Sequence, residues 1–159
     1  MGECADGSRV RASAEATRQA EKGVLIFLLD TCVLSESMRP HRDASVMSWL
    51  TVNELRRQYI SALTVGELYY GAERLSEGRR RRELRLWVRM VEEDYAGRIV
   101  PLDQTVAAVW GRLRGASPNG QTIDMQLAAT ALAYGFTFVT RDVTHFRFNG
   151  LNVVNPWEA

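Results

Sequence analysis

The stretch Val24-Leu25-Ile26-Phe27-Leu28-Leu29-Asp30 decides how this chain folds. An unbroken apolar run, without the alternation of a half-exposed strand, is typical of a strand buried on both faces of a parallel sheet. The run ends at Asp30, a carboxylate placed where the strand should end. In open α/β sheets, ligands bind outside the carboxyl ends of the strands. This stretch therefore predicts a fold class and the position of a site.

Strands and helices alternate along the rest of the chain. The further strands are predicted at residues 59–61, 98–102, 136–139 and 151–154. Helices are predicted to follow the capping residues Asp43, Thr64 and Asp103, to include the helically spaced apolar residues of 84–91, and to occupy residues 123–134 before Gly135. This alternation predicts an α/β fold with a central parallel sheet flanked by helices.

The length of 159 residues suits one domain with one hydrophobic core. Residues 1–23 are small, polar and charged, and we expect them to form a flexible leader. The folded domain is expected to comprise residues 24–159. The hydrophobic fraction of 46% and the net charge of +1 are those of an ordinary globular protein, so no global charge indicates a nucleic-acid partner.

Cysteine usage and hydropathy indicate a cytoplasmic protein. Cys4 and Cys32 lie in unlike contexts and form no CxxC motif, which argues against a disulfide scaffold or a zinc site. No apolar run approaches the roughly 20 residues that a membrane span requires. The N-terminus has no apolar segment of the signal-peptide kind, so we expect neither secretion nor a membrane partner.

Four carboxylates interrupt apolar or small-residue patterns at positions where a sheet edge could gather them. Asp30 follows the first strand, Asp142 follows the strand 136–139, Asp124 opens an apolar helix, and Glu67 lies in the first turns of its helix. Carboxylates are rarely buried unless they are paired or bind a metal. If these strand ends and helix starts converge, they form an all-oxygen cluster.

Such a cluster would favour a hard divalent cation. Crowded carboxylates repel one another and raise one another's pKa values, and Mg²⁺, or alternatively Mn²⁺, relieves this repulsion with the oxygen ligands it prefers. A metal in this position can activate water and neutralise charge on a phosphate, the chemistry of phosphodiester hydrolysis. Both one-metal and two-metal versions remain open. Each acid alone also has a structural explanation, as a turn former or as a first-turn helix residue.

The arginine-rich stretch around residues 79–82 has two interpretations. It could form a basic surface for RNA phosphates, or it could be a solvated helix face balanced by Glu73, Glu77 and Glu83 through near-neighbour pairs, which we favour. Arg141 lies nearer to the predicted acidic cluster and is the better candidate for substrate binding. Thr31 is the second substrate-binding candidate.

The segments around the four acids resemble the motifs of PIN-domain toxins of the VapC and FitB type. The similarity runs from about Val24 to Trp157. Any single motif is weak evidence for the family, but the whole set in this order is specific. Cys32 stands where family members usually have Asn, and His145 stands where many relatives have an acid. We therefore interpret His145 as a surface or packing residue. The matching segments are residues 28–36, 64–68, 123–131, 139–142 and 154–157.

This resemblance implies a PIN-like three-layer sandwich and a magnesium-dependent ribonuclease, the toxin of a type II toxin–antitoxin system. Asp30 and Asp124 match the positions most often treated as metal ligands, and Glu67 and Asp142 complete the set of catalytic, metal-binding acids. The resemblance also implies an RNA substrate, a homodimer, a VapB- or FitA-like antitoxin, and contact with DNA only through that antitoxin.

Two other classes of protein compete with the nuclease. A catalytically silent PIN-like module would bind RNA or protein without cutting, but a pure binder has no need to crowd four acids. An aspartyl-phosphate phosphatase usually has a second Asp two residues after the nucleophile, where this chain has Cys32. A P-loop enzyme is excluded because no GxxxxGK[ST] motif occurs.

Overall fold

The computed structural model describes residues 22–117 and 122–159. At its centre lies a five-stranded sheet with the order β3-β2-β1-β4-β5, in which all the paired strands are parallel. The strands are β1 (Phe27–Leu29), β2 (Gln58–Ser61), β3 (Ile99–Val100), β4 (Thr137–Val139) and β5 (Val153–Val154). The predicted parallel sheet is confirmed, with the first apolar run as its central strand.

Strand β1 is buried on both faces, as its composition predicts. Leu28 belongs to one apolar core, and Phe27 and Leu29 belong to the core on the opposite face. The strand is nevertheless shorter than the predicted 24–29, because β2 and β4 pair with it only from Phe27 onward. Val24 and Leu25 are exposed instead. The predicted strands at 98–102 and 151–154 are likewise too long, since only β3 and β5 within them pair with a neighbour.

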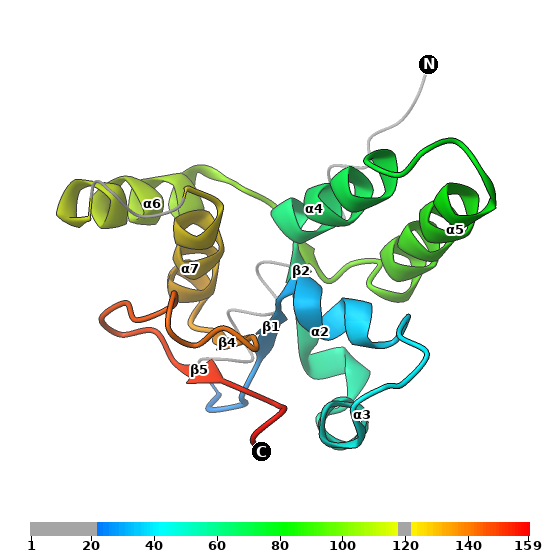
Figure 1. Ribbon diagram of the computed structural model, residues 1–159. Coiled ribbons are helices and arrows are strands. Elements are labelled where there is room, and N and C mark those ends of the chain that lie inside the picture. Colours follow the sequence, from blue (N-terminus) through cyan, green and yellow to red (C-terminus); the bar gives the residue numbers. More distant parts are fainter. Residues whose placement is uncertain (1–21, 118–121) are drawn as a thin grey trace.

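Helices cover both faces of the sheet, as Figure 1 shows. On one face lie α6 (Gln104–Ala116) and α7 (Thr122–Tyr134), whose buried residues share a core with Leu28. The other face carries α2 (Thr31–Glu36), α3 (Ala44–Val52), α4 (Ala62–Glu73) and α5 (Arg79–Asp94), together with the short 3-10 turn η1 (Leu55–Arg57). The predicted three-layer sandwich is therefore confirmed.

The helix ends show which capping predictions were right. The carboxylates of Asp43 and Asp103 accept hydrogen bonds from the first backbone N–H groups of α3 and α6, as predicted. After α7, Gly135 adopts a positive φ of 67°, the conformation that favours glycine at a helix end. The prediction for Thr64 was wrong: Ser61 caps α4, and Thr64 lies buried inside that helix. The strand β2 passes directly into α4, so the cap is the last strand residue.

Helix α2 was not predicted. It begins directly after β1, and Asp30 caps it by accepting a hydrogen bond from the backbone N–H of Thr31 at 2.7 Å. A helix this short gives no periodic pattern to detect. Its presence places Asp30 at a strand end and at a helix start at once.

Two of the predicted features lie outside the described residues. They are the leader, of which residues 1–21 are not described, and the turn at 117–120, of which only Ser117 is described. In the part of the chain that the structure covers, no helix has both the length and the apolar character needed to cross a membrane.

Candidate active site

Asp30 is held at the carboxyl edge of the sheet by three hydrogen bonds to its carboxylate. One oxygen, Oδ1, accepts from the backbone N–H of Thr31. The other, Oδ2, accepts from the hydroxyl of Thr140 at 2.6 Å and from the thiol of Cys32 at 3.3 Å. The Asp30 backbone also donates to Val139 on β4. Asp30 is thus fixed by two neighbouring strand ends.

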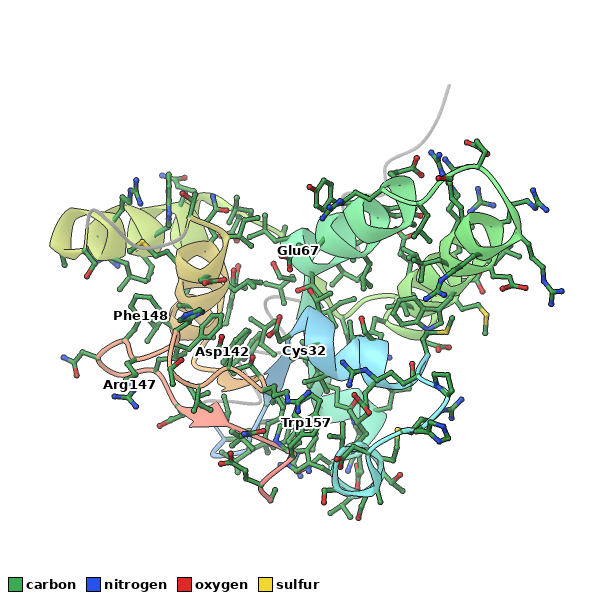
Figure 2. All side chains as sticks on the ribbon, in the orientation of Figure 1. Cys32, Glu67, Asp142, Arg147, Phe148 and Trp157 are labelled. Atoms are coloured by element: carbon green, nitrogen blue, oxygen red, sulfur yellow. The ribbon has the colours of Figure 1, made fainter. Side chains whose placement is uncertain are left out.

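Glu67 faces Asp30 from helix α4. The Thr31 hydroxyl donates to Glu67 Oε2 at 2.7 Å, so the residue after Asp30 ties the two acids together. Burial raises the pKa of Glu67 above its ordinary value, the Thr31 hydrogen bond opposes this shift, and the charges of Asp30 and Asp124 add to it. In Figure 2, Glu67 lies on the side of α4 that faces α7.

Asp124 approaches from the first turn of α7. Burial raises its pKa, His145 counteracts the shift, and the negative charges of Asp30 and Asp142 raise the pKa further. Asp124 therefore interacts with acids from β1 and from the loop after β4. The structure brings all four predicted carboxylates into one electrostatically coupled group, which we call the acidic cluster: Asp30, Glu67, Asp124 and Asp142.

Asp142 is the exposed member of the acidic cluster. Its backbone N–H donates to the Thr140 hydroxyl at 3.1 Å, and its side chain accepts from Thr144 at 2.7 Å. The Thr144 hydrogen bond and the neighbouring His145 hold the pKa of Asp142 below its usual value. In the absence of a metal, Asp142 thus carries its charge more readily than Glu67 or Asp124.

His145 contacts two of the acids, which the sequence analysis missed. Its Nδ1 lies 3.0 Å from Asp142 Oδ2 and 3.9 Å from Asp124 Oδ2. The residue is exposed, as interpreted from the sequence, but it belongs to the site rather than to an unrelated surface. The spacing of three residues between Asp142 and His145 was the available signal, since one turn of chain brings such a pair together.

Thr140 and Cys32 are further site residues that sequence reasoning did not identify. The buried Thr140 hydroxyl accepts from Asp142 and donates to Asp30, so it connects two members of the acidic cluster. Burial first, then the charge of Asp30, raises the pKa of the Cys32 thiol to about 11. Cys32 is therefore a protonated donor to Asp30 at neutral pH, consistent with replacement of Asn by another hydrogen-bond donor.

The two predicted substrate-binding residues have different surroundings. Thr31 donates its hydroxyl to Glu67, so its side chain organises the acidic cluster. Arg141 is exposed, and its guanidinium lies over the ring of Trp157 with 5.3 Å between Cζ and the ring centroid. Of the two, Arg141 has the side chain that remains available to a ligand.

The acidic cluster fits a divalent cation by its chemistry, although its side chains are not drawn together to coordinating distance. Within residues 22–117 and 122–159, no three Asp, Glu, His or Cys side chains converge closely enough to hold a metal ion. The donors are carboxylate oxygens, the ligands preferred by Mg²⁺ and Mn²⁺. Burial first, and then the negative charges of the other acids, raise the pKa values of Glu67 and Asp124, and a bound cation would offset both effects.

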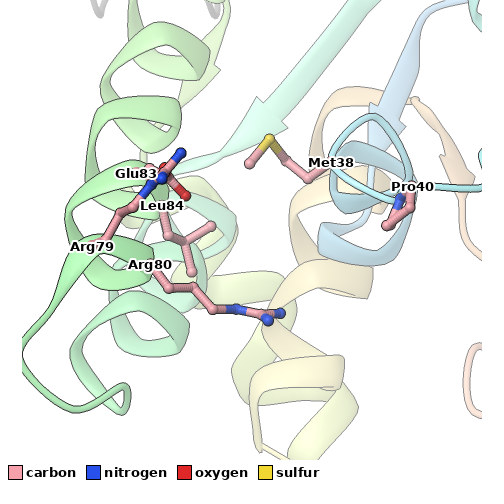
Figure 3. A pocket seen from close by; sticks show the side chains of 6 residues that line it. All are labelled: Met38, Pro40, Arg79, Arg80, Glu83 and Leu84. Atoms are coloured by element: carbon pink, nitrogen blue, oxygen red, sulfur yellow. The ribbon is translucent and has the colours of Figure 1, made fainter.

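A groove elsewhere on the surface is separate from this cluster. It has a volume of about 460 Å³ and lies between the start of α5 and the loop after α2 (Figure 3). Arginines and apolar side chains line it, and no member of the acidic cluster does. The lining residues are Met38, Pro40, Arg79, Arg80, Glu83 and Leu84. The groove is therefore not the candidate active site.

Comparison with known proteins gives the family. The profile of the PIN domain matches residues 27–150. The chain is 34% identical over 141 residues to VapC ribonuclease Y4jK of Sinorhizobium fredii, with 84% of this chain and 99% of the relative covered. It is 37% identical over 140 residues to Toxin FitB of Neisseria gonorrhoeae, with 83% and 99% covered.

A solved structure agrees with these relatives. The crystal structure of FitAcB from Neisseria gonorrhoeae superimposes with a TM-score of 0.77 at 34% identity, covering 84% of this chain and all of the other. The fold is that of a PIN domain. The chain belongs to the PIN-domain family, in the group that includes VapC and FitB.

Proposed function

We propose that the protein is a divalent-metal-dependent ribonuclease, with Mg²⁺ as its metal and Mn²⁺ as a substitute, and that it is the toxin of a type II toxin–antitoxin system. The observation that carries the proposal is the gathering of four carboxylates from different elements at one sheet edge, where contacts with Thr31, Thr140 and His145 link them. Uncompensated negative charge costs stability, so a protein that retains it needs a counterion.

Asp30 and Asp124 are the proposed metal ligands, and Glu67 and Asp142 complete the set. A divalent cation bound there supplies an activated water and stabilises charge on the phosphate. The chain's own residues orient the acids. Thr140 and Cys32 fix Asp30, and Thr31 fixes Glu67. Arg141 is the residue proposed to contact the RNA phosphate.

The biological context follows from the relatives rather than from the site. We propose a cytoplasmic protein that forms a homodimer, binds a VapB- or FitA-like antitoxin, and meets DNA only through that antitoxin. The surface supports a partner, because Tyr69 packs toward Glu92 while the adjacent Tyr70 is 64% exposed. Aromatic residues of this kind are frequent anchors at interface centres. An antitoxin arginine that enters the acidic cluster would compete with metal.

Substitution of the two proposed ligands tests the nuclease activity. Asp30→Ala and Asp124→Ala are each expected to abolish RNA cleavage in Mg²⁺, and excess EDTA should abolish cleavage by the unchanged protein. Glu93→Gln is the matched control, since it removes one exposed acid on α5 and should retain full activity. Circular dichroism checks that each variant is folded.

The outcomes separate the nuclease from a silent binding module. Full cleavage by either folded Ala variant would contradict the site assignment, and full cleavage in EDTA would contradict the metal. If the wild-type protein binds RNA but does not cut it in Mg²⁺ or Mn²⁺, the result would support a catalytically silent binding module instead.

A further inference from the structure

The C-terminal segment after β5 lies against the residues that follow β4. The backbone N–H of Thr140 donates to Val154 at 3.1 Å, so the two strands end side by side. The chain then turns at Asn155, whose side chain accepts from the backbone N–H of Trp157 at 3.1 Å. Pro156 is buried in this turn. The turn fixes Trp157 next to the loop that carries Arg141 and Asp142.

Trp157 is anchored on one side and partly open on the other. Its ring packs against the apolar core that contains Leu29 and Val139, and it remains partly exposed. The Arg141 guanidinium lies over the ring, and the Arg141 backbone N–H donates to Cys32 Sγ at 3.5 Å. Both ends of Arg141 are thus held, the backbone at Cys32 and the side chain at Trp157. Figure 2 labels Cys32, Asp142 and Trp157 in this region.

Arg141 does not pair with the acids beside it. On α5, Arg79, Arg81 and Arg85 all form ion pairs with nearby glutamates. Over the described ranges, the Arg141 guanidinium makes no hydrogen bond or ion pair, although Asp142 is its neighbour in the chain. Asp142 pairs with Thr144 and His145 instead. The contact with the ring uses none of the guanidinium N–H donors in a hydrogen bond to the described residues, so they remain available to a phosphate.

We propose that Trp157 is a positioning residue for RNA binding: its ring holds Arg141 away from the acids and presents the guanidinium edge to a phosphate next to the scissile bond. This inference rests on the proposed ribonuclease function and deepens it. A guanidinium fixed by stacking binds a phosphate with little further loss of side-chain freedom. The C-terminal segment after β5 therefore completes the substrate side of the acidic cluster.

A purely structural role for Trp157 makes a different prediction. If the ring only fills space against the core, its replacement lowers the thermal midpoint and leaves KM unchanged for the protein that remains folded. If it positions Arg141, its replacement raises KM while kcat stays nearly constant. A double-variant comparison adds a second criterion, because residues that act through each other are not additive.

The experiment measures kcat and KM for cleavage of a 12-nucleotide RNA of randomised sequence in Mg²⁺, and its binding in EDTA. The variants are Arg141→Ala, Trp157→Leu, Trp157→Phe and the double variant Arg141→Ala with Trp157→Leu. Leucine keeps an apolar side chain against the core and removes the aromatic face, whereas phenylalanine keeps a face. Arg147→Ala is the matched control, because Arg147 is an exposed arginine of the same loop on its outer side (Figure 2).

We expect Arg141→Ala to raise KM about 10-fold or more, as for loss of a charged hydrogen bond. Trp157→Leu should raise KM about 2- to 5-fold, and the double variant should resemble Arg141→Ala alone. Trp157→Phe and Arg147→Ala should stay close to the unchanged protein. The slope of log Kd against log salt should decrease by about 0.7 for Arg141→Ala, the share of one phosphate on a single strand.

Several results would overturn the inference. An unchanged KM in folded Trp157→Leu, or fully additive effects in the double variant, would remove Trp157 from RNA binding. If the wild-type protein cleaves RNA and the Arg141→Ala variant has the same KM, the inference is refuted and the ribonuclease function stands. If the wild-type protein neither binds nor cleaves RNA, both this inference and the proposed ribonuclease function are refuted. If Trp157→Leu does not fold, Trp157→Met takes its place, because methionine also keeps an apolar side chain against the core and removes the aromatic face, and the same KM criterion applies to it.

Discussion

Glu67 and Glu73 lie on the same helix, α4, and their pKa values are displaced in opposite directions. Burial and the negative charges of Asp30 and Asp124 raise the pKa of Glu67. Hydrogen bonds from Arg85 and Arg81 hold the pKa of Glu73 at about 2. The middle and the C-terminal end of one helix thus belong to two regions: the acidic cluster, where like charges gather, and the face between α4 and α5, where opposite charges pair.

This difference shows that the density of charged residues in the sequence does not indicate where the candidate active site lies. In the most charged stretch of the sequence, at the start of α5, part of the positive charge is paired with nearby glutamates. Arg79 pairs with Glu83, and Arg81 pairs with Glu77 and Glu73. Such exposed pairs stabilise the fold only slightly. The acidic cluster has fewer charges, but among the described residues no arginine or lysine pairs with them, and charge without such a partner is what a metal or a substrate can use.

The largest expected effect separates the two glutamates by activity. Glu67→Gln should lower RNA cleavage about 100-fold or more, because it removes one charge from the site where a cation is held. Glu73→Gln makes the same chemical change on the same helix and should leave cleavage within about 2-fold, since it touches only arginines of α5. Cleavage rates of the two folded variants test this directly. An equal loss of cleavage in both variants would show that the acidic cluster and the face between α4 and α5 do not differ in function.

A smaller effect is expected from the hydroxyl group that orients Asp30. Thr140→Val removes the donor to Asp30 Oδ2 and the acceptor for the Asp142 backbone with little change in volume. Cleavage should fall about 10-fold, and the Mg²⁺ concentration for half-maximal rate should rise, as expected for a lost hydrogen bond to a charged group. Thr51→Val is the control, because the Thr51 hydroxyl bonds only the backbone of Met47 on α3. An unaffected metal requirement in Thr140→Val would show that this hydroxyl does not orient a ligand.

The dependence of stability on pH should have opposite signs in the two regions. The raised pKa of Glu67 means that the folded state binds its proton more tightly than the unfolded state, so stability falls as pH rises from about 4.5 through that raised pKa. The pKa of Glu73, lowered to about 2, means that stability rises as pH increases from about 2 toward 4.5. In EDTA at pH 7, Glu67→Gln should therefore have a higher thermal midpoint than the unchanged protein, and Glu73→Gln a lower one.

Thermal midpoints at pH 3 and pH 7 measure this contrast. Both differences should shrink at pH 3, where Glu67 is protonated in either state and Glu73 has lost part of its advantage. Differences of the same sign at pH 7 would contradict the assignment of opposite pKa displacements.

The sequence predicted the features that short-range chemistry determines. Asp43 and Asp103 were recognised as helix caps and Gly135 as a helix end, because capping depends on a few neighbouring atoms. The central strand was recognised from its unbroken apolar run. The gathering of Asp30 and Asp124 was predicted from one rule, that parallel strand ends and helix starts share an edge.

The remaining features depend on contacts between distant segments. The start of β1 is set by where β2 and β4 begin to pair with it, so Val24 and Leu25 could not be excluded from the strand in advance. The Thr140 hydroxyl contacts Asp30 across the sheet, and Arg141 contacts Trp157 through the pairing of β4 with β5. No local pattern in the sequence reports such contacts.

The smallest effect is expected at the N-terminus, where we propose that residues 1–23 form a leader outside a domain of residues 24–159. A chain that starts at Val24 should keep its thermal midpoint and its cleavage rate, since the residues that enter β1 are exposed as far as Leu25. A chain that starts at Phe27 is the sharper comparison. It loses the Leu25 carbonyl that accepts from Arg57 at 2.8 Å, the Ile26 carbonyl that accepts from Thr137, and the buried Ile26 side chain. Loss of that side chain alone costs about 2–5 kcal/mol when comparable residues are truncated, so its midpoint should fall clearly. A large loss in the Val24 chain would show that residues before it pack on the domain and would move the boundary.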